Sequence, residues 1–208
     1  MKKENEFEII ISQVNWNGGD NNENRIGLTS SYFDNLYKDF KLGSFNESTR
    51  IIIKESNFRL PEDQSKPILL FATGTGIAPY IGFLQELEIK KKLGQSINKI
   101  IFYFGSKNKN YDFIYEDYLI NCDKENIIDK LYLAFSRDQE EKMYIQNAFV
   151  NNFNDNKSYY DIENSYIYVC GGVSMGQSLN NELEKNLGKE FMLKLEKEQR
   201  YIKEFWGK

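Results

Sequence analysis

The pattern of hydrophobic and polar positions changes near residues 61–67. Before this point, residues 7–14 and 50–54 alternate between apolar and polar side chains, which predicts antiparallel strands. A polar loop rich in asparagine and glycine, residues 15–24, and a short helix near residues 30–37 are expected between them.

After Pro67, short apolar strands alternate with amphipathic helices. This alternation predicts a parallel sheet with helices on both faces, and such sheets bind ligands at the carboxyl ends of their strands. We expect one domain over residues 1–64 and a second over residues 65–208. Strands are predicted over residues 67–72, 99–105, 130–135 and 166–170, and helices over residues 77–94, 112–120, 139–151 and 175–187.

Composition excludes several kinds of site. The chain has no histidine, which excludes Ser-His-Asp nucleophiles and the usual zinc sites. Its two cysteines, Cys122 and Cys170, lack Cys-x-x-Cys spacing, so no metal site and no disulfide framework is expected. A net charge of −4 gives no general attraction to nucleic acid, and no apolar run resembles a signal region or a membrane span. We therefore expect a cytoplasmic protein.

The segment Pro67–Glu86, PILLFATGTGIAPYIGFLQE, predicts an apolar strand, a glycine turn and a helix that begins near Ile77. Gly74 and Gly76 allow a ligand to approach the backbone closely, and the following helix N-terminus presents free N–H groups. This turn is suited to a phosphate or a nicotinamide ring. Tight packing between strand and helix is the alternative explanation.

The end of the strand at residues 130–135 carries a hydroxyl, two cations and an aromatic ring. These are Ser136, Arg137, Lys142 and Tyr144, with Gln146 slightly beyond. An adenosine 2′-phosphate needs such a set, because Arg and Lys bind the dianion and an aromatic ring stacks on adenine. An NAD site would instead use a carboxylate, for which Asp138 is the nearby candidate. The alternative is an ordinary helix start with acidic residues near the positive end of its dipole.

Two further strand ends give less specific evidence for a ligand site. Lys107 follows the strand at residues 99–105 and can reach a phosphate, although a solvated lysine is the simpler explanation of this residue alone. Cys170, followed by Gly171 and Gly172, can lie against a flat ring, although an isolated buried cysteine is more often a small core residue.

Together, five segments resemble the C-terminal reductase region of the diflavin NADPH reductases. This family includes NADPH–haemoprotein (cytochrome P-450) reductase and the sulfite reductase flavoprotein, and it is similar to ferredoxin–NADP reductase. The segments are FATGTGIAPYIGFLQE, FYFGSKNKNYDFIYEDYL, LAFSRDQEEKMYIQ, YIYVCGG and RYIKEFWGK, within a match from about Gly27 to Trp206. The resemblance implies an α/β fold: a parallel five-stranded NADP-binding sheet with helices on both faces, preceded by part of an antiparallel FAD-binding β-barrel.

The resemblance also implies a function in electron transport. NADPH would pass a hydride to FAD, and electrons would continue to a flavodoxin-like FMN domain, a haemoprotein or another redox partner. A plant-type ferredoxin–NADP reductase is disfavoured, because those proteins end on a tyrosine where this chain has Trp206. The alternative from another class is an NADP-binding module, or a truncated fragment, without redox activity of its own.

By resemblance, each set of residues receives a role. Cys170 and Glu204 would position the nicotinamide, and Trp206 would cover the flavin. The residues SNFRLP, 56–61, match the last barrel strand. The implied contacts with FAD pyrophosphate come from Gly27, Leu28, Thr29 and Ser30; those with nicotinamide and pyrophosphate from Gly74, Thr75 and Gly76; and those with the 2′-phosphate and adenosine from Ser136, Arg137, Lys142 and Tyr144, with Gln146 nearby. Lys107 and Gly171 are further candidate cofactor-binding residues.

Several departures from the family pattern bear on the expected rates and FAD affinity more than on the cofactor class. The Arg-x-Tyr-Ser strand expected before Phe7 has no counterpart, so the FAD site is incomplete in this chain. The usual Cys-Gly-Asp is Cys-Gly-Gly, with Gly172 in place of the carboxylate. The customary cysteine and arginine after Gly105 are Ser106 and Lys107. The chain is therefore interpreted as a fragment of a longer reductase or a shortened gene product.

Overall fold

The computed structural model of this 208-residue chain describes residues 7–18, 23–44, 50–159 and 162–207. The chain divides into two compact units, Met1–Glu55 and Ser56–Lys208. The two units are described separately below.

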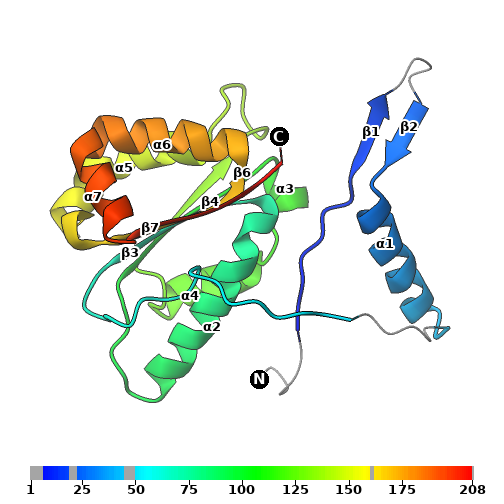
Figure 1. The fold of residues 1–208 in the computed structure, drawn as a ribbon, viewed down its shortest axis with the longest axis horizontal. Helices are drawn as coiled ribbons and strands as arrows, with labels where there is room; N and C mark the ends of the chain where they lie inside the picture. The colour runs from blue at the N-terminus through cyan, green and yellow to red at the C-terminus, as the bar shows by residue number, and fades with distance from the viewer. Residues whose placement is uncertain (1–6, 19–22, 45–49, 160–161, 208) are drawn as a thin grey trace. The chain divides into compact units, whose positions relative to one another are not determined.

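The first unit contains a hairpin and one helix. Strand β1 (Asn15–Gly18) pairs antiparallel with β2 (Glu23–Ile26), and helix α1 (Leu28–Lys41) follows directly (Figure 1). The Gly27 N–H donates to the Val14 carbonyl at 2.7 Å, which ties the start of α1 to the residue before β1. The short helix predicted near residues 30–37 is confirmed, and it is longer than expected.

The strands predicted over residues 7–14 and 50–54 are wrong. Neither segment is a strand, and the loop predicted over residues 15–24 contains most of the hairpin instead. Alternation indicates which face of a strand is apolar, but a strand also needs a hydrogen-bonded neighbour. The apolar residues of these segments are largely exposed, with Phe7 at 65% and Ile52 at 83%.

The second unit is built on a five-stranded parallel sheet in the order β5-β4-β3-β6-β7. This confirms the predicted α/β fold and parallel sheet. The order places β3, the first strand of the second unit, at the centre. The strands are β3 (Ile68–Thr73), β4 (Ile100–Ser106), β5 (Lys130–Phe135), β6 (Tyr166–Gly172) and β7 (Tyr201–Trp206).

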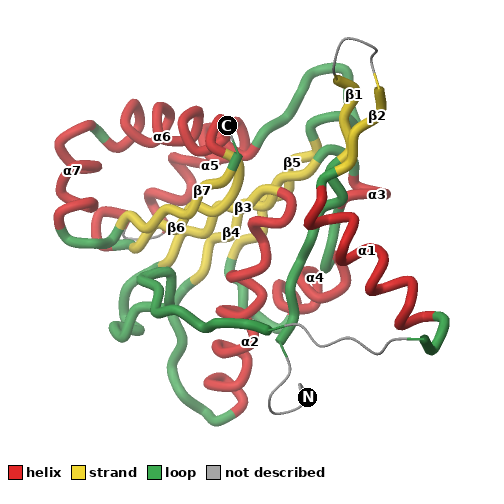
Figure 2. Tube along the Cα trace, turned by 45° about the vertical axis from the view of Figure 1, so that its right-hand side comes forward, coloured by secondary structure: helices red, strands yellow, loops and turns green. Residues whose placement is uncertain are grey.

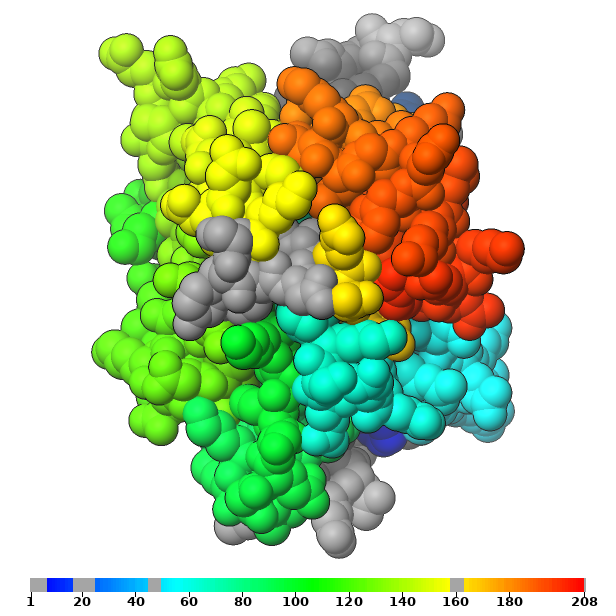
Figure 3. All heavy atoms as spheres, turned by 90° about the vertical axis from the view of Figure 1, so that its left-hand side faces the viewer, coloured from blue at the N-terminus to red at the C-terminus, as the bar shows by residue number. Residues whose placement is uncertain are grey.

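Helices cover both faces of this sheet (Figures 1 and 2). On one face, α5 (Ile145–Tyr159), α6 (Val173–Leu187) and α7 (Lys189–Lys197) pack on a core that includes Phe71, Tyr103 and Val169. Figure 3 shows α6 and α7 side by side at the surface of this face. The opposite face carries α2 (Ala78–Lys92) and α4 (Glu116–Lys124). Short helical turns are η1 (Gly74–Ile77), α3 (Lys109–Asp112) and η2 (Ile162–Asn164).

Two predicted helices differ from the observed ones. The helix expected over residues 112–120 is divided into α3 and α4 by Tyr115, whose φ of 60° breaks the helical repeat. The helix expected over residues 139–151 begins only at Ile145, because side chains compete for the backbone before it. The Gln139 amide donates to the Phe135 carbonyl at 2.7 Å, within a segment, residues 136–144, that consists of a turn, bends and irregular backbone.

The segment before β3 packs in the second unit. The Phe58 ring lies 5.6 Å from that of Tyr80 and 5.4 Å from that of Tyr168, whose hydroxyl donates to the Arg59 carbonyl at 2.6 Å. The compact units therefore divide before Ser56, earlier than the predicted boundary between residues 64 and 65. The barrel strand expected over residues 56–61 is wrong, since this segment is irregular.

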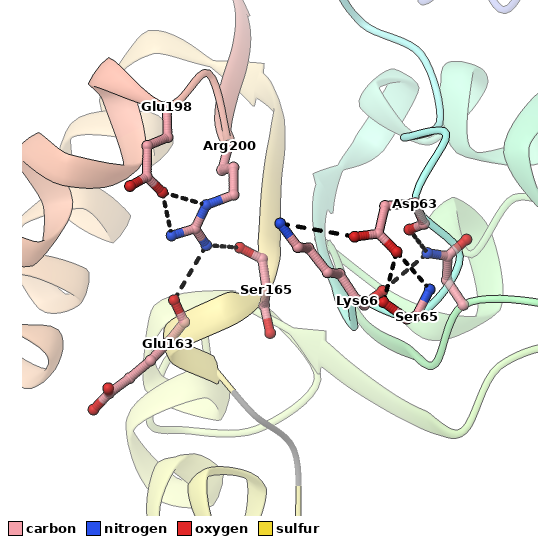
Figure 4. A network of polar contacts seen from close by, with 8 residues as sticks. Asp63, Ser65, Lys66, Glu163, Ser165, Glu198 and Arg200 are labelled. Carbon is pink, nitrogen blue, oxygen red and sulfur yellow. Dashed lines mark hydrogen bonds and ion pairs between the residues drawn. The ribbon is translucent and has the colours of Figure 1, made fainter.

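A buried arginine joins the amino ends of β6 and β7 (Figure 4). Arg200 is 4% exposed and donates to the Ser165 carbonyl at 2.7 Å and the Glu163 carbonyl at 3.2 Å. Its Nε also donates to the Glu198 carboxylate at 2.8 Å. These bonds fix the end of the sheet opposite to the strand ends on which the sequence places the candidate site.

Candidate functional site

The carboxyl ends of all five strands meet at one edge of the sheet. The register pairs Thr73 of β3 with Gly105 of β4, and Gly105 with Ala134 of β5. On the other side, Ala72 pairs with Cys170 of β6, and Gly172 pairs with Trp206 of β7. Candidate residues that are far apart in the sequence are therefore brought to a common edge.

The glycine turn after β3 packs directly against β6. A Cβ placed on Gly76 would stand 2.2 Å from the Cys170 carbonyl oxygen and 3.0 Å from Cη2 of the Trp206 ring. Only a residue without a side chain fits there. The structure thus brings Gly76, Cys170 and Trp206 into one place. The first turn is η1, with Gly74 at a φ of +53°, and the α-helix starts at Ala78.

Cys170 is a buried thiol that stays protonated. It is 3% exposed and pairs in register with Glu204 of β7. Burial, and secondly the nearby Glu204 carboxylate, raise the pKa of Cys170 to about 12. At neutral pH the thiol is a compact, uncharged group beside the glycine turn. Glu204 itself is exposed, and Trp206 is 42% exposed.

Gly171 has a packing role that the sequence does not reveal. A Cβ there would lie 2.4 Å from Oγ1 of Thr73 and 2.3 Å from Cε of Met175. The residue therefore allows β6, β3 and the start of α6 to approach closely. Thr73, at the carboxyl end of β3, is a site residue that sequence reasoning missed, and its place at the end of the predicted strand was the available signal.

The segments after β4 and β5 remain hydrogen-bonded beyond the strands. The Ser136 N–H donates to the Ser106 carbonyl at 3.0 Å, and the Arg137 N–H donates to the Lys107 carbonyl at 2.8 Å. Lys107, Ser136 and Arg137 are thus brought together. Within the described ranges, no hydrogen bond or ion pair occupies the side-chain cations of Lys107 or Arg137.

The turn that follows carries the remaining predicted residues. Lys142 is exposed, and Tyr144, at 43% exposure, immediately precedes α5. Gln146 lies in the first turn of α5. Its Oε1 is buried and, among the described residues, has no hydrogen-bond partner. Oγ of Ser106 is in the same situation. Ser106 was missed as a candidate, although the sequence places it directly at a strand end.

These observations fit an NADP molecule. A Cβ on Gly74 would meet nothing within 4 Å, so the open side of the glycine turn is at Gly74 rather than at the packed Gly76, and the exposed cations suit a phosphate dianion. Among the described residues, the buried Ser106 and Gln146 oxygens have no hydrogen-bond partner, and buried polar atoms are usually bonded to protein groups or ordered water.

The candidate FAD residues lie in the first unit, at the start of α1. The Ser30 hydroxyl accepts a bond from the Val14 N–H at 3.2 Å and donates to the Gly27 carbonyl at 3.1 Å, so it is used within the unit. Leu28 and Thr29 are exposed. Their backbone N–H groups, free at a helix start, suit a phosphate but supply nothing for a flavin ring. The described part of this unit fits the pyrophosphate portion of FAD alone.

Other kinds of site receive no support. Among residues 7–18, 23–44, 50–159 and 162–207, no group of three or more His, Cys, Asp and Glu residues is placed to hold a metal ion. No helix in these same ranges is both long enough and apolar enough to cross a membrane.

Comparison with known proteins agrees with the geometry. A model for the oxidoreductase NAD-binding domain matches residues 70–181. NADPH–cytochrome P-450 reductase of Salmo trutta is 32% identical over 166 residues, which cover 74% of this chain and 28% of that protein. Nitric oxide synthase of Drosophila melanogaster is 31% identical over 216 residues, covering 97% and 16%. The sulfite reductase [NADPH] flavoprotein alpha-component of Buchnera aphidicola is 32% identical over 179 residues, covering 85% and 28%.

The chain spans less than a third of the length of each of these relatives. The matched family model covers more than half of the chain, including β3, β4, β5 and β6 with the loops that follow them. The chain therefore belongs to the oxidoreductase NAD-binding domain family and contains the NADP-binding region of the diflavin reductases.

Proposed function

We propose that this chain is an NADPH-dependent flavin oxidoreductase domain, in which hydride passes from NADPH to FAD and electrons continue to a redox partner. The observation that carries the proposal is the gathering of two groups at one sheet edge. Lys107, Ser136 and Arg137 lie after β4 and β5, and Gly76 and Cys170 lie after β3 and within β6. The first group suits a 2′-phosphate and the second suits a nicotinamide.

At the phosphate end, the residues act by charge and geometry. Arg137 offers a planar fork of donors, whereas Lys107 offers a point charge from the neighbouring segment. Lys142 adds a further exposed cation, and the Tyr144 ring offers a surface for adenine. Ser106 and Gln146 supply the buried oxygens that need partners. Nucleotides with the 2′-phosphate are therefore expected to bind best.

At the other end, the residues position a ring and exclude water. NADPH supplies a hydride and FAD accepts it when both are bound, so the protein has little proton chemistry to perform. The neutral Cys170 thiol and the Gly74–Gly76 turn provide a compact wall for the nicotinamide. Glu204 adds a negative charge that stabilises positive charge developing on the ring. Trp206 would cover the flavin ring and would have to move for the nicotinamide to enter.

The proposal also includes a flavin site and an electron acceptor. Gly27, Leu28, Thr29 and Ser30 would hold the FAD pyrophosphate at the start of α1. The electron acceptor would be a flavodoxin-like FMN domain, a haemoprotein or another redox protein, in keeping with the named relatives. A cytoplasmic location is part of the same proposal.

Calorimetric titration and a visible absorption spectrum test this function. We expect the 208-residue chain to bind NADPH far better than NADH, to hold FAD weakly, and to reduce artificial acceptors poorly even with added FAD. Equal affinities for NADPH and NADH would contradict the NADP assignment. Tight stoichiometric FAD with rapid dye reduction would instead show a complete flavin site.

A second function is favoured by the irregular, exposed segments at residues 7–14 and 50–54. Without flavin, the chain would be an NADP-binding module that does no redox chemistry of its own. The same experiment separates the two functions, because NADPH binding without flavin absorption after FAD addition supports the module.

A further inference from the structure

Asp138 connects two segments of the candidate site through its carboxylate. Its Oδ1 accepts a hydrogen bond from Nδ2 of Asn108 at 3.0 Å, and its Oδ2 accepts one from the Lys109 backbone N–H at 2.8 Å. Asn108 and Lys109 follow β4, whereas Asp138 follows β5. Both carboxylate oxygens are therefore used to tie one strand-end segment to the other.

These bonds complete a row of contacts between the same two segments. The last pair of the sheet ladder is Ser106 with Phe135, and the backbone bond from Arg137 to Lys107 extends the register beyond it. In a parallel pair, this continuation places Lys107 opposite Ser136. Asp138, next to Arg137, makes the last of these contacts. It accepts the Lys109 N–H, which has no partner within the helix because it lies at the start of α3.

We propose that Asp138 is a positioning residue that sets the preference for nucleotides with a 2′-phosphate. This inference rests on the proposed NADP-binding function. By holding the two segments in register, Asp138 would fix the backbone positions of Lys107 and Arg137, the two cations proposed to bind the 2′-phosphate. Binding groups that are held in place before the ligand arrives lose less conformational entropy. The same two bonds also occupy the carboxylate that an NAD site would direct at the ribose hydroxyl.

The sign of the mutational effect separates this role from simple electrostatics. A carboxylate near a phosphate dianion repels it, so loss of the charge alone would strengthen binding of the 2′-phosphate. Loss of the two hydrogen bonds that Asp138 accepts would weaken binding of the 2′-phosphate, because the segments that carry Lys107 and Arg137 would no longer be held together. Loss of an acceptor for the ribose 2′-hydroxyl would weaken binding of 5′-AMP, which carries that hydroxyl, and would not weaken binding of 2′,5′-ADP, whose 2′-oxygen is phosphorylated.

Calorimetry with 2′,5′-ADP and 5′-AMP on the full chain provides the test. Asp138→Ala is expected to raise the Kd for 2′,5′-ADP about three- to tenfold, as for one or two lost hydrogen bonds, and to change the Kd for 5′-AMP by less than about twofold. Asp138→Asn, a smaller change, should act in the same direction, because its amide group presents a donor to Asn108 or Lys109. Asn108→Ala should have a partial effect alone and none when added to Asp138→Ala.

Asp129 is the matched control. Its Oδ2 accepts a bond from the Ile100 N–H at 2.7 Å, so it joins β4 and β5 at their opposite ends. Asp129→Ala should leave the ratio of the two Kd values unchanged. An equal change in this control, or unchanged or tighter binding of 2′,5′-ADP by Asp138→Ala, would overturn the proposal.

Failure of the proposed function and failure of the Asp138 inference give different results. If the unmodified chain binds 2′,5′-ADP no better than 5′-AMP, both the function and the role of Asp138 are wrong. If Arg137→Ala removes a clear preference and Asp138→Ala leaves it intact, only the role of Asp138 is wrong.

Discussion

Gly76 lies against the backbone carbonyl of Cys170, with no space for a side chain between them. A Cβ on Gly76 would stand 2.2 Å from that oxygen, which belongs to the central part of the sheet and cannot turn aside like a flexible side chain. This contact sets the distance between the glycine turn and β6, where we propose that the nicotinamide binds.

Gly76→Ala is expected to lower the free energy of unfolding by about 1–3 kcal/mol, because the added methyl group overpacks a backbone contact. NADPH affinity should fall with it. Gly82 is the control: it lies in α2, and a Cβ there meets nothing within 4 Å. Gly82→Ala should stabilise by about 0.5–1 kcal/mol. Urea unfolding of both variants measures the difference, and equal stabilities would refute the packing argument.

Arg137→Ala tests the phosphate end of the site. Charge-assisted hydrogen bonds contribute roughly 1.5–3 kcal/mol, so NADPH affinity should fall about ten- to a hundredfold. NADH affinity should hardly change, because NADH lacks the 2′-phosphate. Lys189→Ala, at the start of α7, removes one exposed cation elsewhere and serves as the control. A parallel loss of NADH affinity in Arg137→Ala would point to damage to the fold.

The buried Cys170 thiol should react slowly with thiol reagents at about pH 8, since burial raises its pKa to about 12 from an ordinary value of about 9. Unfolding should make both cysteines of the chain reactive. Glu204→Gln should lower the pKa of Cys170 only in part, because burial is the larger cause. A fast-reacting Cys170 in the folded chain would contradict this environment.

The raised pKa of Cys170 also predicts that the stability of the fold falls at alkaline pH. The unfolded thiol ionises from about pH 9, whereas the folded thiol keeps its proton until about pH 12. The contribution of the buried, protonated Cys170 thiol to the free energy of unfolding is therefore complete below pH 9 and is lost as the pH rises toward 12. Cys170→Ala should reduce this dependence without abolishing it, because burial raises the pKa of Tyr80, Tyr168 and Tyr201 in the same direction.

Arg200→Ala should destabilise the second unit by about 1–3 kcal/mol, because the hydrogen bonds that Arg200 donates to the carbonyls of Glu163 and Ser165 are lost. Arg200→Lys should not restore stability, since an ammonium lacks the planar fork that reaches several acceptors. Lys92, which pairs with Glu88 on the surface of α2, is the control, and Lys92→Ala should cost less than about 1 kcal/mol. Similar midpoints in urea for the two alanine variants would show that the Arg200 network is unimportant.

The sequence by itself determined the α/β class and the places where site residues occur. Short apolar strands that alternate with helices can bury both faces only as a parallel sheet, and the carboxyl ends of those strands share one edge. The GTG turn, the residues after β5 and Cys170 could therefore be recognised one at a time. Local patterns failed where a strand needs a partner, at residues 7–14 and 50–54.

Only the tertiary structure decided which of these residues meet. The strand order β5-β4-β3-β6-β7 brings Gly76 against Cys170 and Trp206, and no local pattern encodes contacts between such distant positions. Asp138 shows the same limit, because its sequence context suggests a ribose acceptor while its carboxylate bonds to Asn108 and Lys109. A side chain's partners depend on which strands are neighbours, and pairing between distant segments follows from the packing of the whole sheet rather than from local periodicity.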